Sequence, residues 1–485
     1  MQAPLSLPLD PRICEQARLS RDARFDGLFF TAVSSTGIFC RPVCPAPAPK
    51  PRHVTYFPSA ASAAAAGFRP CLRCRPERAP GTSSWRSGSE LVAGALRLID
   101  DGVLDDAPVA ALATRVGVGE RHLRRLFAET LGASPLQVAA TRRLLFAKQL
   151  LGETALGMTD IALAAGYGSA RRFNATFSAA YGMAPRDVRR GRALARDGDE
   201  LQLRLPYRPP YDLGGLLAFF ARRALPGVEG VDAHSYRRSF VLRGSPGTFE
   251  VRALADEPAL LLSVRHAQVQ ALPEIVNRVR RQFDLDADPA TIAGVLRRDR
   301  QLAPVLRRFP GVRVPGCWDG FEIAVRAVLG QQVSVAAART LAARLVQRWG
   351  AAFELADGAT ATAFPSPGVL ADVDLTAIGV TRSRAQTIRT LARAVGDGRV
   401  AFRPEQGLDA FVDAWTQLPG IGAWTAHYIA MRALGHPDAF PAADLILRKV
   451  AGNGVAVPTR ELEQRSQAWR PWRSYATLLL WRASA

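Results

Sequence analysis

Four of the chain's six cysteines stand in two close pairs, a spacing that suits a metal ion. Three residues separate Cys40 from Cys44, two separate Cys71 from Cys74, and 26 lie between the pairs. The first pair alone could equally be a metal half-site, a redox pair or two buried thiols. With the second pair, four thiolates can surround a tetrahedral ion, which predicts one closed zinc site. The two single cysteines are interpreted as ordinary core or surface thiols: Cys14 and Cys317.

A single acid, Asp444, provides the second chemical signal, because it follows a glycine-rich turn by about 20 residues. The stretch "LPGIG" at 418–422 predicts a tight turn between two helices. Backbone amides at the start of the second helix can hold a phosphate, which makes Gly420 and Gly422 candidate DNA contacts. A glycine-rich helix turn without any ligand is the common alternative. The Gly/Pro-rich loop that leads to Asp444 favours the DNA-binding interpretation.

The overall composition predicts a polyanionic partner. The 485 residues carry a formal net charge of +20, from 63 basic and 43 acidic side chains, and nearly all of the basic residues are arginines. Arginine matches phosphate oxygens bidentately, so a nucleic acid is the expected partner, and the repeat described below specifies double-stranded DNA. A codon bias toward arginine contributes to this net charge, but such a bias alone does not explain why acidic residues are so much fewer than basic ones. The sequence has no run of 18 apolar residues and no evident signal peptide, so we expect a cytoplasmic protein without a membrane partner.

The paired cysteines must be positioned by a small domain over residues 1–80. Between the pairs, "HVTYF" predicts a short strand, and "SAASAAAAGF" predicts a short helix capped by its first serine and ended near Gly67. A domain of about 80 residues with few large apolar side chains gains stability from a metal. The Gly/Ser-rich stretch at 80–90 is predicted to be a linker.

An internal repeat follows the linker. Residues 112–135 align with 161–185, and each copy has a short apolar helix, a glycine turn and a second, arginine-rich helix. This is the order of a helix-turn-helix, in which the second helix enters the major groove, whereas an ordinary helical hairpin is the alternative for either copy alone. Four apolar residues at helical spacing should be core: Leu123, Phe127, Phe173 and Phe177. The candidate readers of DNA are Glu120, Arg121, Arg124, Arg125, Ser169, Arg171, Arg172 and Asn174.

From residue 201 the pattern changes, after a charged link at 190–200. Strand-like runs between 239 and 265 predict an antiparallel sheet, and everything after about 270 is predicted to be helical. We therefore expect a multidomain α+β protein: a small zinc-stapled α/β domain, an all-α double helix-turn-helix domain, and an α+β cap with a helical bundle. The predicted domains span residues 1–80, 88–192, 201–270 and 271–485.

Residues 21–77 resemble the N-terminal domain of the Ada family of alkylation-response proteins, through "TGIFCRP", "GFRPC" and the final Cys-x2-Cys. The resemblance implies that a zinc-bound thiolate takes a methyl group from a methylphosphotriester in DNA, with Cys40 as the acceptor. A purely structural zinc ribbon is the alternative. Loss of one negative charge on methylation could raise affinity for DNA. Nearby arginines are expected to contact phosphates: Arg41, Arg69, Arg73 and Arg75.

Residues 90–190 resemble the AraC/XylS family of bacterial transcription regulators, most clearly in "GYGSARRFNATFSAAYGMAP". For a regulator of this kind, RNA polymerase is a candidate partner.

Residues 201–485 resemble the HhH-GPD base-excision glycosylases, and within them the 3-methyladenine DNA glycosylase II type, through "PPYDLGGLLAFFA", "GFEIAVRAVLGQQVSVAAA" and "LPGIGAWTAHYIAMRALG". The resemblance implies that Asp444 supports loss of a flipped, alkylated base. It also implies an aromatic cleft around the base, made by Phe219, Trp424, Tyr428 and Trp481. Electron-rich rings attract the cationic base. Gln331 and Gln332 lie in the loop expected to fill the gap that the base leaves.

Two departures from that family sharpen the prediction. Trp424 occupies the position of the lysine that bifunctional members use for a Schiff base, so a monofunctional glycosylase is expected. No four-cysteine cluster follows Cys317, so no iron–sulfur cluster is expected. The sequence thus predicts a glycosylase fused to a methylation-sensing transcription regulator. The alternative is an alkylation-responsive transcription factor whose C-terminal part only binds lesions.

Overall fold

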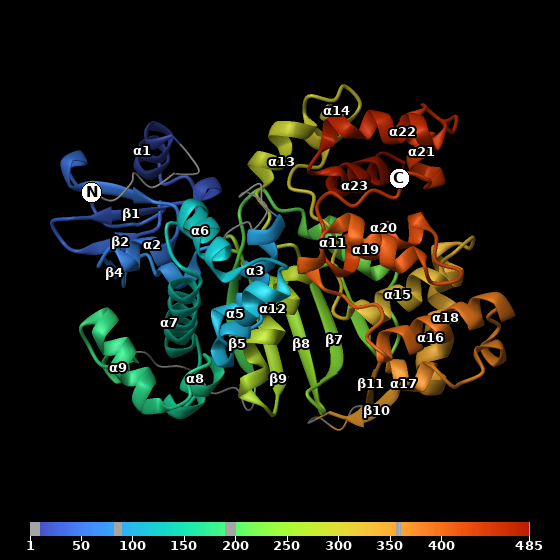
Figure 1. The fold of residues 1–485 in the computed structure, drawn as a ribbon, viewed down its shortest axis with the longest axis horizontal. Coiled ribbons are helices and arrows are strands. Elements are labelled where there is room, and N and C mark those ends of the chain that lie inside the picture. Colours follow the sequence, from blue (N-terminus) through green and yellow to red (C-terminus); the bar gives the residue numbers. More distant parts are fainter. Residues whose placement is uncertain (1–9, 82–89, 190–199, 356–357, 359, 485) are drawn as a thin grey trace. The chain divides into compact units, whose positions relative to one another are not determined.

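The computed structural model describes residues 10–81, 90–189, 200–355, 358 and 360–484. Two compact units divide the chain (Figure 1). The first comprises Met1–Pro209, Leu254–Asn277 and Leu285–Ala287, and the second comprises Pro210–Ala253, Arg278–Asp284 and Asp288–Ala485. The predicted links at 80–90 and 190–200 fall almost wholly outside the described residues. Within the described residues, no helix has both the length and the apolar character that a membrane crossing requires.

The first unit begins with a small sheet that carries the cysteines. After α1 (Pro11–Leu19), strands β1 (Phe30–Val33), β2 (Ile38–Cys40), β3 (Val54–Phe57) and β4 (Arg69–Pro70) form a sheet in the order β3-β1-β2-β4. The predicted short helix is α2 (Ala60–Ala65), and Ser59 caps it through a reciprocal hydrogen-bond pair with Ser62. Buried Phe30, Phe39 and Phe57 pack against this helix, so the strand that ends at Cys40 has a rigid backing.

The helical part of the first unit confirms the repeat. Its first helix-turn-helix consists of α5 (Val109–Arg115) and α6 (Glu120–Leu131), and its second of α8 (Met158–Ala164) and α9 (Ala170–Tyr181). The long helix α7 (Pro135–Glu153) joins the two pairs (Figure 1). Helices α3 (Glu90–Asp100), α4 (Val103–Asp106) and α10 (Pro185–Arg189) flank them. The four apolar positions predicted as core are all fully buried: Leu123, Phe127, Phe173 and Phe177.

Two strands complete the first unit. β5 (Leu201–Pro206) pairs antiparallel with β9 (Ala259–His266). β9 falls within the predicted strand region, whereas β5 was not predicted. Helix α12 (Leu272–Gln282) begins in the first unit and ends in the second.

The second unit combines a small sheet with a helical bundle. Strands β6 (Glu229–Val231), β7 (Ser235–Leu242) and β8 (Ser245–Ala253) run antiparallel, and α11 (Leu213–Ala221) precedes them. The bundle contains α13 (Pro289–Leu296), α14 (Leu302–Arg308), α15 (Gly320–Leu329), α16 (Val335–Trp349), α17 (Pro367–Leu370), α18 (Arg382–Gly396), α19 (Leu408–Thr416), α20 (Ala423–Ala433), α21 (Leu445–Ala451), α22 (Thr459–Ser466) and α23 (Arg473–Ala483).

The prediction that only helices follow residue 270 was wrong. β10 (Ala351–Glu354) and β11 (Thr360–Ala363) form an antiparallel hairpin directly after α16. Its second strand is held by a residue far away in the sequence, because the amide of Thr362 donates a hydrogen bond to the carbonyl of Gly227 at 2.9 Å. A tertiary contact of this kind leaves no local signal in an alanine- and threonine-rich segment.

A buried ionic cluster fixes the sheet against the bundle within the second unit. Arg238 on β7 pairs with Glu322 on α15, and Arg326, one turn further along α15, pairs with Glu229 at 3.1 Å and with Glu322 at 2.8 Å. The side chains of the two acids and Arg238 are at most 6% exposed. Buried pairs of this kind need well-defined geometry, so α15 has a fixed position against the sheet.

Candidate active site and candidate metal centre

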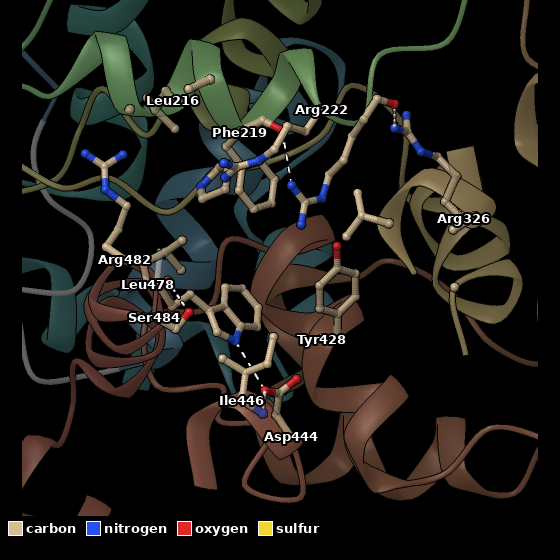
Figure 2. Close-up of a pocket in the computed structure, with 18 of the residues that line it drawn as sticks. Leu216, Phe219, Arg222, Arg326, Tyr428, Asp444, Ile446, Leu478, Arg482 and Ser484 are labelled. Atoms are coloured by element: carbon tan, nitrogen blue, oxygen red, sulfur yellow. Dashed lines mark hydrogen bonds between the residues drawn. The ribbon is translucent and has the colours of Figure 1, made fainter. Parts of the chain in front are cut away.

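A cavity of about 760 Å³ in the second unit brings together the predicted acid and the predicted aromatic residues. Trp424 and Tyr428 lie one turn apart on α20 and stack at 5.4 Å, with their planes only 10° apart. Trp481 comes from α23 and Phe219 from α11. Figure 2 shows Asp444 and Tyr428 facing the cavity from the helical bundle, with Phe219 across from them. The cavity can therefore take a planar group between aromatic rings, beside a carboxylate.

Asp444 is held by hydrogen bonds on both of its carboxylate oxygens. It is the N-cap of α21, and Oδ1 accepts from the amides of Ile446 and Leu447, each at 3.0 Å. The indole of Trp481 donates to Oδ1 at 3.3 Å, and the indole of Trp424 donates to Oδ2 at 3.1 Å. The carboxylate is thus fixed in orientation by a helix start and by two of the aromatic residues that line the cavity.

Two arginines in this cavity region were not predicted. Arg223 places its guanidinium 3.7 Å from the ring centre of Phe219, and its Nη1 donates to the carbonyl of Phe219 at 3.2 Å. Arg432 lies 4.8 Å from the same ring and donates to the hydroxyl of Tyr428 at 2.7 Å. Arg432 follows Trp424 and Tyr428 at four-residue spacing, so helical periodicity was a signal for it. Nothing in the sequence marked Arg223.

These cations change the electrostatics of the cavity. Burial lowers the pKa of Arg223 to about 10. Burial alone would raise the pKa of Tyr428, but the guanidinium groups of Arg432 and Arg223 outweigh it and hold that pKa below its usual value. The phenol is therefore a strong hydrogen-bond donor at the edge of the aromatic pocket.

The predicted hairpin lies between α19 and α20, and only glycine fits its turn. Gly420 has a φ of +86°, and a Cβ there would lie 2.1 Å from Oγ1 of Thr387. Gly422 is the N-cap of α20 and has nothing within 4 Å of its Cβ position. Both glycines are exposed, as a backbone contact with phosphate requires.

The two glutamines after α15 differ in their surroundings. Nε2 of Gln331 donates to the carbonyl of Gly420 at 2.9 Å and to Oγ1 of Thr425 at 3.1 Å. Gln331 therefore ties its loop to the hairpin. Gln332 is exposed and has a left-handed backbone, with φ of +55°. Of the two, only Gln332 has an exposed side chain.

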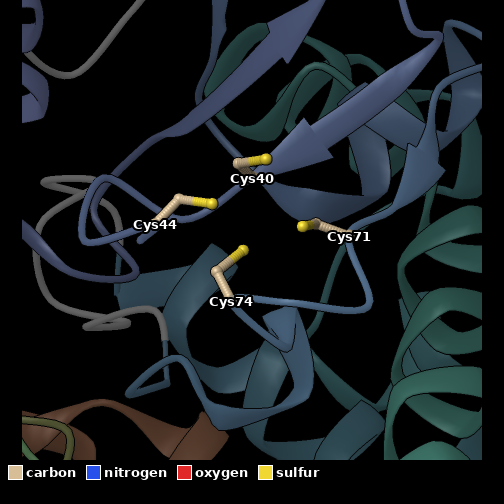
Figure 3. Close-up of side chains that lie close together, drawn as sticks. All are labelled: Cys40, Cys44, Cys71 and Cys74. Atoms are coloured by element: carbon tan, nitrogen blue, oxygen red, sulfur yellow. The ribbon is translucent and has the colours of Figure 1, made fainter. Parts of the chain in front are cut away.

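In the first unit the four paired cysteines converge. Their sulfur atoms all lie within 4.8 Å of one another, and Figure 3 shows them pointing toward a common centre. Zinc–sulfur bonds of about 2.3 Å in a tetrahedron place sulfurs just under 4 Å apart, so this donor set fits zinc. Hydrogen bonding with Cys40, ahead of the other neighbouring thiols, raises the pKa of Cys74. Such crowding of thiols is relieved when a divalent cation binds.

The cysteines are not equally accessible. A cavity of about 930 Å³ is lined by Cys40, Cys44 and Cys71 but not by Cys74. The sulfur of Cys74 is buried and accepts the amide of Arg41 at 3.3 Å. This hydrogen bond and its burial make Cys74 a ligand rather than a nucleophile.

Two of the arginines predicted to contact phosphates form ion pairs with nearby acidic residues. Arg41 pairs with Asp26 and donates to the carbonyl of Cys74 at 3.0 Å. Arg75 pairs with Glu77 at 3.0 Å and has only 11% of its side chain exposed. Nearby buried carboxylates thus bind both guanidinium groups, and a phosphate contact by either arginine stays a prediction. Arg69 and Arg73 are exposed and line the cavity.

The predicted readers of DNA lie on the second helix of each helix-turn-helix. Six of these side chains are exposed: Arg121, Arg124, Arg125, Arg171, Arg172 and Asn174. Glu120 pairs with Arg124 at 2.5 Å, and Ser169 is the N-cap of α9. These last two side chains therefore have local structural partners.

Comparison with known proteins assigns four segments to families. Residues 13–77 match the metal binding domain of Ada, and residues 112–191 match a helix-turn-helix domain. Residues 202–319 match the AlkA N-terminal domain, and residues 325–474 match the HhH-GPD superfamily of base excision DNA repair proteins. The predicted modules and their order are confirmed, and the matched metal domain agrees with one zinc ion at the four cysteines.

Single relatives extend these matches. The chain is 42% identical over 482 residues to the probable bifunctional transcriptional activator/DNA repair enzyme AlkA of Mycobacterium tuberculosis, covering 96% of this chain and 95% of that protein. It is 33% identical to DNA-3-methyladenine glycosylase 2 of Escherichia coli over 57% of this chain and 95% of that protein. A 3-methyladenine DNA glycosylase structure from Archaeoglobus fulgidus covers 58% of this chain and 97% of its own, with a TM-score of 0.51 and 22% identity, and shows a shared fold.

Proposed function

The chain belongs to the family of bifunctional transcriptional activators and DNA repair enzymes that includes AlkA of Mycobacterium tuberculosis, and we propose how its residues divide that work. In this proposal the second unit hydrolyses the N-glycosidic bond of alkylated bases, and Cys40 in the first unit accepts a methyl group from the DNA backbone. The observation that carries the first half is Asp444, held at the edge of an aromatic cavity.

The cavity is the proposed site of the flipped base. An N-alkylated purine carries positive charge, and the faces of Trp424, Tyr428 and Trp481 attract it. Phe219 has a guanidinium over its ring, so it contributes a wall rather than a free stacking face. Gln332 is proposed to fill the gap in the duplex, while the amides at Gly420 and Gly422 bind a phosphate.

Asp444 is proposed to stabilise the sugar as the base leaves. As the bond between C1′ and the base nitrogen breaks, its electron pair goes to the base and the sugar becomes oxocarbenium-like. A fixed carboxylate stabilises that positive charge without reorganising. Water then adds its hydroxyl to C1′ and gives its other proton to the solvent, while the cationic base leaves as a neutral molecule. Trp424 offers no amine, so no Schiff base forms and the enzyme has no lyase step.

Replacing Asp444 by asparagine tests the assignment. Asparagine still caps a helix, so the fold should persist while the negative charge is lost. We expect release of 3-methyladenine from methylated DNA to fall by about 10²–10³-fold, the usual effect of removing one preorganised electrostatic group.

Asp374→Asn is the matched control, since Asp374 caps a helical turn, does not line the cavity and accepts the amide of Thr376 at 3.0 Å. Its rate should equal that of the wild type. Release by Asp444→Asn at the wild-type rate would show that the acid lies elsewhere. Binding of lesions without release of any base by the wild type would favour the purely regulatory alternative.

Cys40 is the proposed methyl acceptor in the first unit. It ends β2 and lines the cavity beside the cluster. Zinc held by the four cysteines keeps their thiols deprotonated, and thiolate is the nucleophilic form. In the transfer, a carbon–oxygen bond of the phosphotriester breaks, a sulfur–carbon bond forms, and the electron pair stays on the phosphate oxygen. The neutralised phosphotriester thereby becomes an ordinary anionic phosphate.

The remaining assignments complete the proposal. Exposed arginines on α6 and α9 are proposed to bind promoter DNA, with RNA polymerase as a further partner of the regulator. Domain bounds of 1–80, 88–192, 201–270 and 271–485 remain our proposal. A chromosomal substrate favours a location at the bacterial nucleoid, in the cytoplasm.

A further inference from the structure

The cavity beside Cys40 has a wall that comes from the second helix-turn-helix. Tyr181, the last residue of α9, and Met183, two residues later, line the same cavity as Cys40, Arg69 and Arg73. More than 100 residues of sequence separate this turn from the cysteine pairs. The metal-binding module alone therefore does not form the complete cavity.

The turn is anchored on both of its sides. The Tyr181 side chain is 3% exposed and its ring stacks on Phe177, with centroids 4.4 Å apart. On the other side, Nη1 of Arg69 on β4 donates to the carbonyl of Tyr181 at 3.5 Å. Gly182, which lies between Tyr181 and Met183 in the chain, has a φ of +70°. A Cβ at this position would lie 3.2 Å from the same Arg69 nitrogen. The backbone of the turn thus packs closely against the strand beside the cysteines.

A second contact between the two modules is ionic and buried. Just after Cys74, the carboxylate of Glu77 forms an ion pair with Lys148 on α7, and Nζ lies 2.5 Å from the carboxylate oxygen. The side chains of this pair are 1% and 2% exposed. Arg78 on the same short helical turn pairs with Glu153, also on α7, at 3.1 Å. Buried pairs tolerate little displacement, so the helix-turn-helix wall is a fixed part of the cavity.

The residues that line the cavity beside Cys40 indicate which kind of ligand binds there. None of the lining residues is acidic, and the exposed cations Lys50, Arg69 and Arg73 stand around the cysteines. Anionic phosphates suit these cations. Met183 adds a flexible, apolar side chain at the rim, a type that adapts to an apolar sugar face or methyl group. Together these features fit a sugar–phosphate backbone rather than a compact anion.

We propose that the second helix-turn-helix supplies one wall of the methyl-acceptor pocket, with Met183 contacting the sugar–phosphate backbone next to the methylated phosphate. The inference rests on the proposed role of Cys40. A strand that delivers its methyl group then touches the regulatory module during the transfer itself. Methyl acceptance depends on α9 and its following turn as well as on the cysteines.

The chain offers a matched pair of methionines for the test. Met183 lines the cavity, whereas Met158 starts α8 in the same helix-turn-helix, is similarly half-buried and does not line it. Met183→Glu and Met158→Glu are made in the full-length, zinc-loaded protein, with Met183→Ala as a milder variant. The methylation rate of Cys40 is followed by mass spectrometry on a short duplex that carries one methylphosphotriester. Methyl iodide serves as a small electrophile that needs no pocket, and bound zinc is measured for each variant.

An anion at the rim should repel the backbone, so we expect Met183→Glu to react with the duplex about tenfold more slowly than Met158→Glu. Zinc content and the rate with methyl iodide should be equal in both. Equal rates on the duplex for the two variants would overturn the inference. A wild-type protein that reacts with methyl iodide but never with the duplex would overturn the proposed role of Cys40, and the inference with it.

Discussion

His427 is a half-buried titratable residue next to a residue that lines the cavity of the second unit, and it gives this unit a defined response to pH. It precedes Tyr428 on α20, and its Nδ1 accepts the amide of Phe440 at 3.4 Å. Burial, reinforced by the charge of Arg473, lowers the pKa of His427 from 6.5 to about 4. The unfolded chain therefore binds a proton between these values while the folded chain does not. The contribution to stability is complete above pH 6.5 and is lost as the pH falls toward 4.

The loss from this one residue should amount to about 3 kcal/mol across that interval. Urea unfolding followed by tryptophan fluorescence measures it, at pH 7 and at pH 4.5. His427→Gln should reduce the difference in the free energy of unfolding between the two pH values. His234→Gln, at an exposed site, should leave that difference unchanged. An identical pH dependence in wild type and His427→Gln would contradict the prediction.

At the level of residues, the sequence identified the side chains that a motif marks and missed those that only packing selects. Asp444, Trp424 and Tyr428 follow the hairpin at fixed spacing, so the motif predicted them, and the structure brings them together. Arg223 follows the end of α11, and its guanidinium lies over the ring of Phe219. No local sequence pattern predicts such a contact. The ion pairs of Arg41 with Asp26 and of Arg75 with Glu77 were not predicted, since the sequence does not show which acid a given arginine faces.

Among the elements, the hairpin before α20 makes the strictest demand on sequence. Gly420→Ala would force an alanine into a left-handed conformation and place its Cβ against Thr387. We expect a loss of about 2 kcal/mol or more in the free energy of unfolding, together with weaker binding to duplex DNA. Gly422→Ala is the control, because its Cβ meets nothing and its φ is −90°. Equal stability of the two variants would mean that the turn rearranges freely.

Elements with their own periodicity and caps were predictable, and elements fixed by distant partners were not. The serine-capped helix α2 and the two helix-turn-helix motifs carry complete local signals. β5 and the β10–β11 hairpin lack them: β5 pairs with β9 more than 50 residues away, and β11 is held by Gly227. Loop-mediated pairing over such separations is decided by tertiary packing.

At the scale of the molecule, one lysine joins the metal-binding module to the regulatory helices. The chain has only three lysines, and Lys148 is the buried one. Lys148→Met removes the charge that faces Glu77, so we expect a loss of about 3 kcal/mol in stability of the first unit. Hydrogen exchange in α7 and in residues 71–78 should rise together. Lys449→Met, at an exposed position, should change neither. Faster exchange in only one of the two segments would show that they are not coupled.

The capping role of Asp444 has an evolutionary consequence. Because the same carboxylate begins α21 and faces the cavity, most substitutions of this proposed catalytic acid would also fray α21. Asparagine and serine are exceptions, since each preserves the cap and removes the charge. If Asp444 has its proposed role, a lineage could therefore change from cutting damaged DNA to merely sensing it by a single substitution at this position that keeps α21 intact.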